Sequence, residues 1–294
     1  MPAPEGYKAE SGKEESYLRL IIRRFLMHRL AVIGLLIFIL IILMAIFAPI
    51  IAPYDSNAIS RQLNAPPSDE HLLGTDQIGR DVLSRLIYAS RVSLIVGIGA
   101  VAIYVAIGTI VGAISGYYGG WVDMLVMRIT DIVMSFPALI VILVIVSIIG
   151  PSLTNLVLIL GFLSWPSVAR LVRGSVLSLK EMDFVKSGVS LGYSAMRILF
   201  NHIMPNAIAP ILVQATFGIA GAIMMEASLS FLGMGVQPPT ASWGNMLTGA
   251  QSISILTSQP WLWVPPGVMI ILAILSINFI GDGLRDAIDP KSLK

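Results

Sequence analysis

Residues 30–51 read LAVIGLLIFILIILMAIFAPII, and this stretch decides the class of fold. It holds no charged residue, and it is slightly longer than the roughly 20 apolar residues that a helix needs to cross a bilayer. It is too long for the apolar region of a signal peptide, and Ala48-Pro49-Ile50 is a poor match to a cleavage site. The stretch therefore predicts a membrane anchor at the N-terminal side of the chain.

Further apolar segments make the chain a polytopic membrane protein. They are Val92–Ser115, Ile132–Ile149, Leu153–Ala169, Ile208–Met225 and Trp261–Ile280. Lipid demands that each segment satisfy its own backbone hydrogen bonds, which a helix does. We therefore expect an all-α fold with six transmembrane helices and membrane lipid around them.

Composition excludes several other classes of protein. The chain has 294 residues, of which 56% are hydrophobic and 12% are charged, and its net charge is +2. Such a composition argues against a disordered chain, a nucleic-acid binder and a typical soluble enzyme. The chain has no cysteine, which excludes a disulfide framework, a zinc finger and a thiol nucleophile.

The distribution of basic residues predicts the orientation. Six spans put both termini on one side, and that side collects fifteen of the 19 Lys and Arg residues. By the positive-inside rule, both termini are expected in the cytoplasm. The predicted organisation is a cytoplasmic tail (1–29), a first transmembrane helix (30–51), an extracytoplasmic loop (52–91), a transmembrane core (92–281) with a cytoplasmic loop (170–206), and a cytoplasmic tail (282–294).

The chain lacks the chemistry of an enzyme or a motor. It has no phosphate-binding loop of the G-x-x-x-x-G-K-[ST] type and no H-E-x-x-H motif, and its three histidines fall on different loops. We therefore expect no catalytic residue, no metal site and no cofactor in this chain.

Polar residues inside the spans are few, and each has two readings. Gln214, Glu226 and Asn278 are candidates for a translocation pathway or gate. Gln214 and Asn278 could instead form hydrogen bonds between helices, and Glu226 could be an outer-interface carboxylate bonded to neighbouring backbone. Arg128 and Asp131, three residues apart, are expected to form a local ion pair.

Two further patterns concern packing. Gly108, Gly112 and Gly116 place small residues on one helix face, for tight internal packing or for an interface with a second subunit. Between residues 74 and 91, Asp76–Arg80 and Asp81–Arg85 are each spaced i,i+4. A helix there would pair these charges on the outer side, either as a structural clamp or as a docking element.

The cytoplasmic loop carries the most specific pattern. Residues 183–192 read DFVKSGVSLG and can form a short helix with an apolar side. The small pair Ser187–Gly188 would let that helix press close to another protein. Gly192 is placed to end the helix in the left-handed conformation, and a second amphipathic stretch is expected to end at Pro205.

This loop resembles the E-A-A-x-x-x-G…I-x-L-P loop of the permease subunits of bacterial ABC importers. Lys186, Ser187 and Gly188 occupy the E-A-A positions, Gly192 matches the later glycine, and residues 203–205 match the end of the motif. Lys186 reverses the charge of the acidic residue usual there, so the carboxylate contact of the family is not carried over.

A second resemblance narrows the group. Residues 73–85 (LGTDQIGRDVLSR) are similar to a signature of the C-type permeases of peptide and nickel importers, as are residues 226–233 and 279–290. The resemblance implies a type I ABC importer permease in a bacterial cytoplasmic membrane, with a paralogous B-type permease, two cytoplasmic ATP-binding subunits and an extracytoplasmic substrate-binding protein.

What the resemblance implies for individual residues is a coupling helix that docks on an ATPase. Its expected members are Asp183, Phe184, Lys186, Ser187, Gly188, Gly192 and Pro205. ATP would be bound by the partner subunits, and the cargo would be dipeptides or oligopeptides, with nickel or metal chelates as the alternative. An ion-coupled secondary carrier and a scaffold protein stay open as alternatives from other classes.

Overall fold

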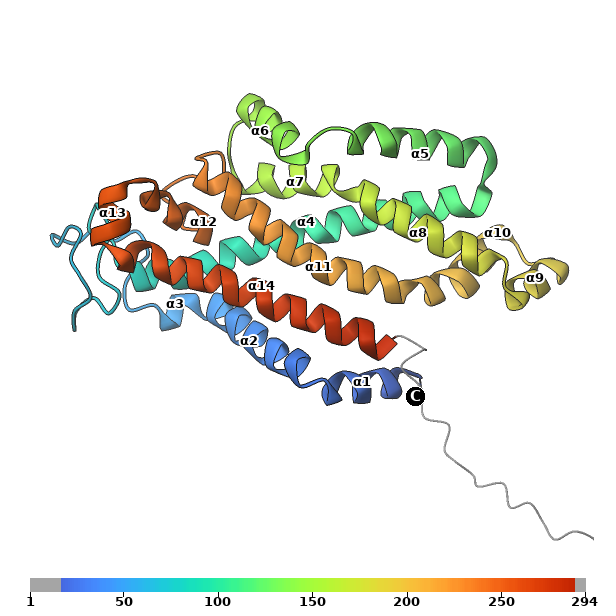
Figure 1. The fold of residues 1–294 in the computed structure, drawn as a ribbon, viewed down its shortest axis with the longest axis horizontal. Helices are drawn as coiled ribbons and strands as arrows, with labels where there is room; N and C mark the ends of the chain where they lie inside the picture. The colour runs from blue at the N-terminus through green and yellow to red at the C-terminus, as the bar shows by residue number, and fades with distance from the viewer. Residues whose placement is uncertain (1–16, 289–294) are drawn as a thin grey trace, which may run out of the picture.

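The computed structural model describes residues 17–288, and its regular elements within that range are helices (Figure 1). Their bounds are α1 Tyr17–Met27, α2 Arg29–Ile46, α3 Ala48–Ile51, α4 Val82–Tyr118, α5 Gly120–Met134, α6 Ala138–Ile149, α7 Leu153–Leu163, α8 Trp165–Lys180, α9 Asp183–Ser190, α10 Ala195–Arg197, a π-helical turn η1 Ile198–Ile203, α11 Met204–Phe231, α12 Trp243–Met246, a 3₁₀ helix η2 Leu247–Gln251, α13 Ile253–Ser258 and α14 Pro260–Ile288. The prediction of an all-α fold is confirmed.

Five helical runs are long and apolar enough to cross a membrane. They are α2, α4, α7 with α8, α10 through α11, and α14. A sixth crossing is formed by α5 and α6 only if that pair counts as one span, because it bends by 81° at its break. Five to six spans therefore agree with the prediction from the sequence.

The predicted bounds of the third span, Ile132–Ile149, are wrong. Residue 132 lies near the end of α5, and the chain turns at residues 135–137 before α6 starts. Pro137 explains the break, because its ring disfavours the helical conformation at the residue before it. The bent pair covers much more chain than predicted, from Gly120 to Ile149.

The boundaries of two other spans differ from the predicted ones. Helix α4 begins at Val82 rather than Val92, so the outer loop ends at residue 81. The α7–α8 run continues to Lys180, well past the predicted end at Ala169, because Pro166 stands in the first turn of α8, where its missing N–H breaks no hydrogen bond.

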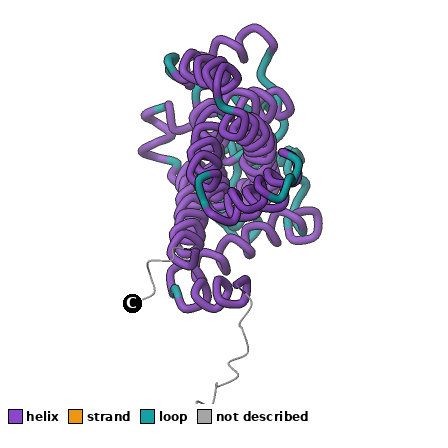
Figure 2. The backbone as a smooth tube through the Cα atoms, turned by 90° about the vertical axis from the view of Figure 1, so that its right-hand side faces the viewer, coloured by secondary structure: helices purple, strands orange, loops and turns teal. Residues whose placement is uncertain are grey.

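The long helices run side by side along the longest axis, with α4 packed against α2, α7, α8 and α11 (Figure 1). The two ends of the described chain and α9 lie at one end of the bundle, and residues 52–81 with α12 and α13 lie at the other. Figure 2 looks at the bundle from the end that carries α9 and shows helices joined mainly by short loops. An even number of crossings gives this arrangement.

Three glycines bring α4 close to α8. A Cβ atom at Gly108 would lie 2.6 Å from the Cβ of Val168, and one at Gly116 would lie 3.0 Å from the carbonyl oxygen of Arg173. Gly112 is equally close to the backbone of Ala169. The glycine face is thus occupied inside the chain, which confirms the tight internal packing and contradicts the alternative of a subunit interface.

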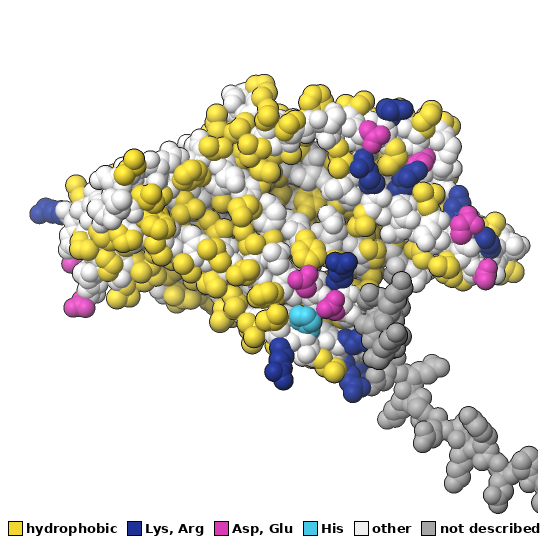
Figure 3. Space-filling view, viewed as in Figure 1, with side chains coloured by type: hydrophobic (Ala, Val, Ile, Leu, Met, Phe, Trp, Pro, Cys, Tyr) yellow, Lys and Arg dark blue, Asp and Glu magenta, His cyan; other side chains and the backbone are white. Residues whose placement is uncertain are grey.

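The surface shows where the membrane lies. Figure 3 shows apolar side chains across the middle of the molecule and charged ones gathered mainly toward the end with α9. Large side chains on the outer faces of several helices are well exposed, among them Leu40 at 65%, Ile110 at 61% and Ile148 at 78%. Such a wide apolar surface matches lipid and not water, so the chain is a multi-pass membrane protein.

Helix α1 was not predicted from the sequence, which places residues 17–27 in the cytoplasmic tail without a helix. The helix packs against α14, where the ring of Phe25 lies over Gly283. Its exposed side carries Arg19 and Arg23 beside Ile22 and Leu26. Helix α1 therefore fits the boundary between lipid and water, because its apolar side chains can contact lipid while its arginines contact water and headgroups.

Candidate functional site

The predicted coupling helix is α9, joined to the end of α8 by two residues, Glu181 and Met182. Val185 and Gly188 face inward and are buried. A Cβ atom on Gly188 would lie 3.4 Å from the ring of Tyr193, an ordinary van der Waals distance, so the nearest neighbour of Gly188 is a side chain of its own subunit. The close contact of Gly188 is thus with its own chain, and not with open space beside the helix.

The turn after α9 is fixed by Gly192. Its φ is +78°, a left-handed value that glycine adopts without steric cost. The N–H of Gly192 donates to the carbonyl of Val189, and the N–H of Tyr193 donates to the carbonyl of Gly188 (3.1 Å). These two bonds form a Schellman motif, which confirms that Gly192 ends the helix.

Tyr193 anchors α9 to the start of the next helical run. Its ring stacks on His202 with the centroids 5.8 Å apart, and the guanidinium of Arg197 lies 4.1 Å from its centroid. A cation above an aromatic face is attracted by the quadrupole of the ring. The α9 turn is therefore a defined structure and not a loose loop.

The outer side of this tip is apolar and uncovered. It presents side chains from α9, the turn and the following helix, with Leu191 71% exposed; the set is Met182, Phe184, Val189, Leu191, Met196 and Phe200. We call these six residues the apolar tip. Asp183, Lys186 and Ser187 are also exposed, and the ammonium of Lys186 lies 3.0 Å from a carboxylate oxygen of Glu181.

Pro205 does not end a helix, so that prediction is wrong. It lies in the first turn of α11, inside a helical run that extends from Ala195 to Phe231. The π-helical turn η1 directly precedes it, and the N–H of Met204 bonds five residues back to Leu199. This wider turn accommodates a proline that would otherwise clash with the preceding turn of an α-helix.

Glu226 lies inside the helix bundle. It is fully buried and accepts hydrogen bonds from the hydroxyls of Ser93 on α4 (3.1 Å) and Ser230 on α11 (2.6 Å). The Ser93 oxygen also accepts the backbone N–H of Trp243 in α12 (3.2 Å). The predicted backbone partners are therefore wrong: side-chain hydroxyls surround the carboxylate and join three helices.

Gln214 and Asn278 are half-buried on α11 and α14. Within the described residues, no hydrogen bond from either side chain is formed, so the hydrogen-bonding reading of these two residues has no support in the isolated subunit. The three pathway candidates are not brought together in one site.

A cavity of about 510 Å³ lies where the α5–α6 break faces the junction of α7 and α8. It is lined from the α5–α6 break, the α7–α8 junction and α11, by residues that include Tyr104, Phe136, Ser164, Ser167 and Met225. Its wall is mostly apolar with a few hydroxyl groups, a pattern typical of small-molecule sites. The sequence gives little signal for this cavity, because its residues come from four separate segments.

Two ion pairs hold α5 against α8. Arg173 forms a bidentate pair with Asp123, with Nε–Oδ1 and Nη2–Oδ2 both at 2.5 Å, and Arg170 lies 2.8 Å from Asp131. The predicted pair of Arg128 with Asp131 is therefore wrong, because Asp131 takes a partner from another helix. Bidentate carboxylate–guanidinium pairs are strong and directional, so α5, the first half of the bent span, is tied to α8.

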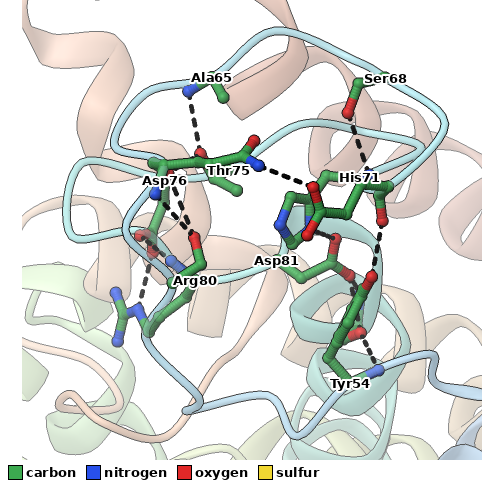
Figure 4. Close-up of polar contacts among 12 residues, drawn as sticks. Tyr54, Ala65, Ser68, His71, Thr75, Asp76, Arg80 and Asp81 are labelled. Atoms are coloured by element: carbon green, nitrogen blue, oxygen red, sulfur yellow. Dashed lines mark hydrogen bonds and ion pairs between the residues drawn. The ribbon is translucent and has the colours of Figure 1, made fainter.

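The segment 74–85, which is predicted to lie outside the membrane, is a structured turn followed by the start of α4, and the predicted helix over its first part is wrong. Figure 4 shows its polar contacts. Asp76 and Arg80 do pair (2.7 Å), but across a turn. Asp81 caps α4 by accepting from the backbone N–H of Ser84 (2.7 Å) and contacts His71 Nδ1 at 2.9 Å, so it does not pair with Arg85.

Comparison with known proteins agrees with this geometry. Residues 108–294 match the family model of the binding-protein-dependent transport system inner membrane component, and residues 16–67 match the N-terminal TM domain of oligopeptide transport permease C. The dipeptide transport system permease protein DppC of Alkalihalophilus pseudofirmus is 44% identical over 293 residues, covering 99% of this chain and 94% of the relative.

Two other relatives are named for the transport of different peptides. The oligopeptide transport system permease protein OppC of Bacillus subtilis is 42% identical over 273 residues (92% of this chain, 88% of the relative). The glutathione transport system permease protein GsiD of Pectobacterium atrosepticum is 41% identical over 271 residues (92% and 89%). The bent span, the capped tip helix and these matches lead to one conclusion: the chain belongs to the family of binding-protein-dependent transport system inner membrane components, the permease subunits of ABC importers.

Proposed function

We propose that this subunit imports short peptides, as half of a pathway that it forms with a paralogous B-type permease. Relatives named for dipeptide, oligopeptide and glutathione transport support this class of cargo over nickel or metal chelates. Two cytoplasmic ATP-binding subunits drive the process, and an extracytoplasmic binding protein delivers the peptide. Both termini and α9 face the cytoplasm, which the excess of Lys and Arg at that end supports.

The observation that carries the proposal is the apolar tip. Six large apolar side chains gather outside the lipid-facing band, at the end where basic residues are abundant. Exposed apolar patches on such an end mark protein contacts. The tip is stiffened by the Schellman turn and by the stacked ring of Tyr193, so a partner that binds there moves α8 directly.

Family membership also weighs against the alternatives from other classes. An ion-coupled carrier needs an ionisable group that reaches the pathway, whereas Glu226 is enclosed by hydroxyls inside the bundle. The cavity between the α5–α6 break and the α7–α8 junction weighs against a scaffold protein, because a scaffold has no use for a cavity inside its helix bundle.

The test replaces one residue of the apolar tip. In the complete transporter, Val189→Asp would bury an unpaired carboxylate at the contact, which costs several kcal/mol. Because each loss of about 1.4 kcal/mol in binding free energy weakens binding tenfold, we expect at least a tenfold fall in peptide-stimulated ATP hydrolysis. We also expect the ATP-binding subunits to be lost on purification. Ser178→Asp, an exposed position on α8 outside the tip, is the matched control.

Two outcomes would contradict the proposal. Val189→Asp transporters that keep their ATP-binding subunits and full hydrolysis would refute the role of the tip. A reconstituted complex that takes up Ni²⁺ chelates with ATP, but no dipeptide or oligopeptide, would refute the cargo.

A further inference from the structure

A second cavity lies in the outer cap of the molecule, at the end of the bundle opposite α9. Its volume is about 500 Å³, within the roughly 300–1,000 Å³ of small-molecule sites. The turn before α4, the first residues of α4, the segment 245–255 and the first turn of α14 surround it. Three parts of the chain that are distant in sequence, residues 76–85, residues 245–255 and the start of α14, thus converge on one hollow.

One pole of this cavity is cationic. Among the residues that line it, Asp76 is the only acid, and Arg80 and Arg85 are the only bases. The Oδ2 atom of Asp76 lies 2.7 Å from Nε of Arg80 and 3.7 Å from Nε of Arg85, so two guanidinium groups share one carboxylate oxygen. One positive charge is left without a counter-charge at this pole.

Arg85 is the less satisfied of the two bases. Its side chain is 6% exposed, yet its Nη1 reaches only the carbonyl oxygens of Ser56 and Pro239, at 3.3 and 3.4 Å. Buried charge is costly unless it is paired with good geometry. A ligand carboxylate at this pole would complete the pairing that Asp76 supplies only in part.

The opposite wall suits the rest of a small ligand. Ile78, Ile255 and Leu262 provide apolar surface, while Thr248 and Gln251 provide groups that form hydrogen bonds with amides. A carboxylate next to an apolar side chain and a peptide bond is the chemistry of a peptide C-terminus.

We infer that this cavity binds the free C-terminal carboxylate of a short peptide at the outer end of the pathway, with Arg80 and Arg85 as its ligands. The inference rests on the peptide import proposed above. It adds a peptide contact within the permease itself, separate from any contact in the binding protein.

The test uses photo-crosslinking on the complete permease–ATPase complex in lipid nanodiscs, without the binding protein. The probe is alanyl-p-benzoylphenylalanine, as the free acid and as the C-terminal amide, and labelled residues are mapped by mass spectrometry. The free acid is expected to label the wall around Ile78, Ile255 and Leu262, with a half-saturating concentration about tenfold lower than that of the amide.

Two substitutions should move the affinity in opposite directions. Arg80→Gln removes one ligand and should weaken the binding of the free acid about tenfold. Asp76→Asn removes the competing charge and should strengthen binding, since an asparagine Oδ1 can still accept the backbone N–H groups of Ile78 and Arg80. Misfolding cannot produce a gain, and Arg61→Gln, exposed in the same outer segment, is the matched control.

Several results would overturn the inference. They are equal labelling by acid and amide, weaker binding in Asp76→Asn, or an Arg80→Gln variant that binds the free acid as tightly as the wild type. ATP-dependent peptide uptake by the same complex, reconstituted together with its binding protein in sealed proteoliposomes, separates the two proposals. Uptake without acid-specific labelling refutes this site alone, and absence of peptide uptake refutes the proposed function.

Discussion

Replacing Gly112 by alanine should destabilise the permease, although alanine is the better helix former. A Cβ atom there would collide with the carbonyl oxygen of Ala169 and would lie 2.9 Å from Cβ of Val172 and 3.0 Å from the carbonyl carbon of Ala169. Backbone atoms cannot step aside as a flexible side chain does, so α4 and α8 must separate. Overpacking of this kind costs about 2–3 kcal/mol, at the upper part of the usual range.

The gain in helix propensity opposes this cost. Alanine is favoured over glycine in a helix interior by about 1 kcal/mol, which leaves a net loss of about 1–2 kcal/mol for Gly112→Ala. Gly174, on α8, has no atom within 4 Å of the added Cβ, so Gly174→Ala should stabilise the protein by up to about 1 kcal/mol. Both substitutions replace glycine by alanine in a helix, but they should change the free energy of unfolding in opposite directions.

The free energy of unfolding can be measured by SDS titration of the purified permease in mixed micelles, followed by tryptophan fluorescence. The two variants are expected on opposite sides of the wild type, separated by about 2–3 kcal/mol. If Gly112→Ala is as stable as the wild type or more stable, the close approach of α4 and α8 is not what requires glycine here.

Three other predictions follow from the described contacts. Glu226→Gln should keep ATP-driven uptake within about twofold and leave it insensitive to collapse of the proton gradient. The amide oxygen can still accept one serine hydroxyl, and the amide NH2 can donate to the oxygen of the other serine. Uptake lost in this variant would restore a proton-relay role. A double-mutant cycle of Asp123→Asn and Arg173→Gln, measured by SDS unfolding, should give a coupling of about 1–3 kcal/mol for the bidentate pair, and a coupling near zero would mean that α5 is held by other contacts. Single cysteines at the exposed positions Ser178 and Asp69 should react with an impermeant thiol reagent only at the second position in intact cells or spheroplasts, and the reverse pattern would invert the topology.

The sequence predicts the helical fold well, because lipid leaves few alternatives for an apolar run of sufficient length. The capping role of Gly192 is equally visible, since a glycine after an amphipathic run has one common use. These features depend on residues that are neighbours in the chain, so no tertiary information is needed to find them.

The start of α4 shows where this reasoning fails. Residues 82–91 include Ser84, Arg85 and Ser90, which a hydropathy pattern places outside the membrane, yet all three are buried in the helix. Asp81 begins the helix there as its N-cap, and Arg85 contacts the carbonyl oxygens of two residues distant in sequence, Ser56 and Pro239. Buried polar groups with long-range partners are invisible to local patterns.

The ion-pair predictions were wrong for a related reason. Spacings of three or four residues predict partners only if the segment is a helix and if no better partner approaches from elsewhere. Asp131 takes Arg170 from α8, and Asp76 meets Arg80 across a turn. Both cavities are likewise assembled from segments far apart in the chain, so they could be found only in the folded structure.

The junction of α7 and α8 at Ser164 has a mechanical consequence. Helix α8 has 16 residues, which at 1.5 Å per residue gives a rod of about 24 Å between that junction and the tip helix. A tilt of about 10° at Ser164 would carry the far end sideways by about 4 Å, roughly the width of a peptide backbone. Because α5 is clamped to the same rod, it would swing along, and the wall of the cavity at the two breaks would open or close with it. A small movement of the tip helix by an ATP-binding partner would thus be transmitted along α8 to the cavity. That path covers most of the membrane thickness, and α8 itself would not need to change its internal structure.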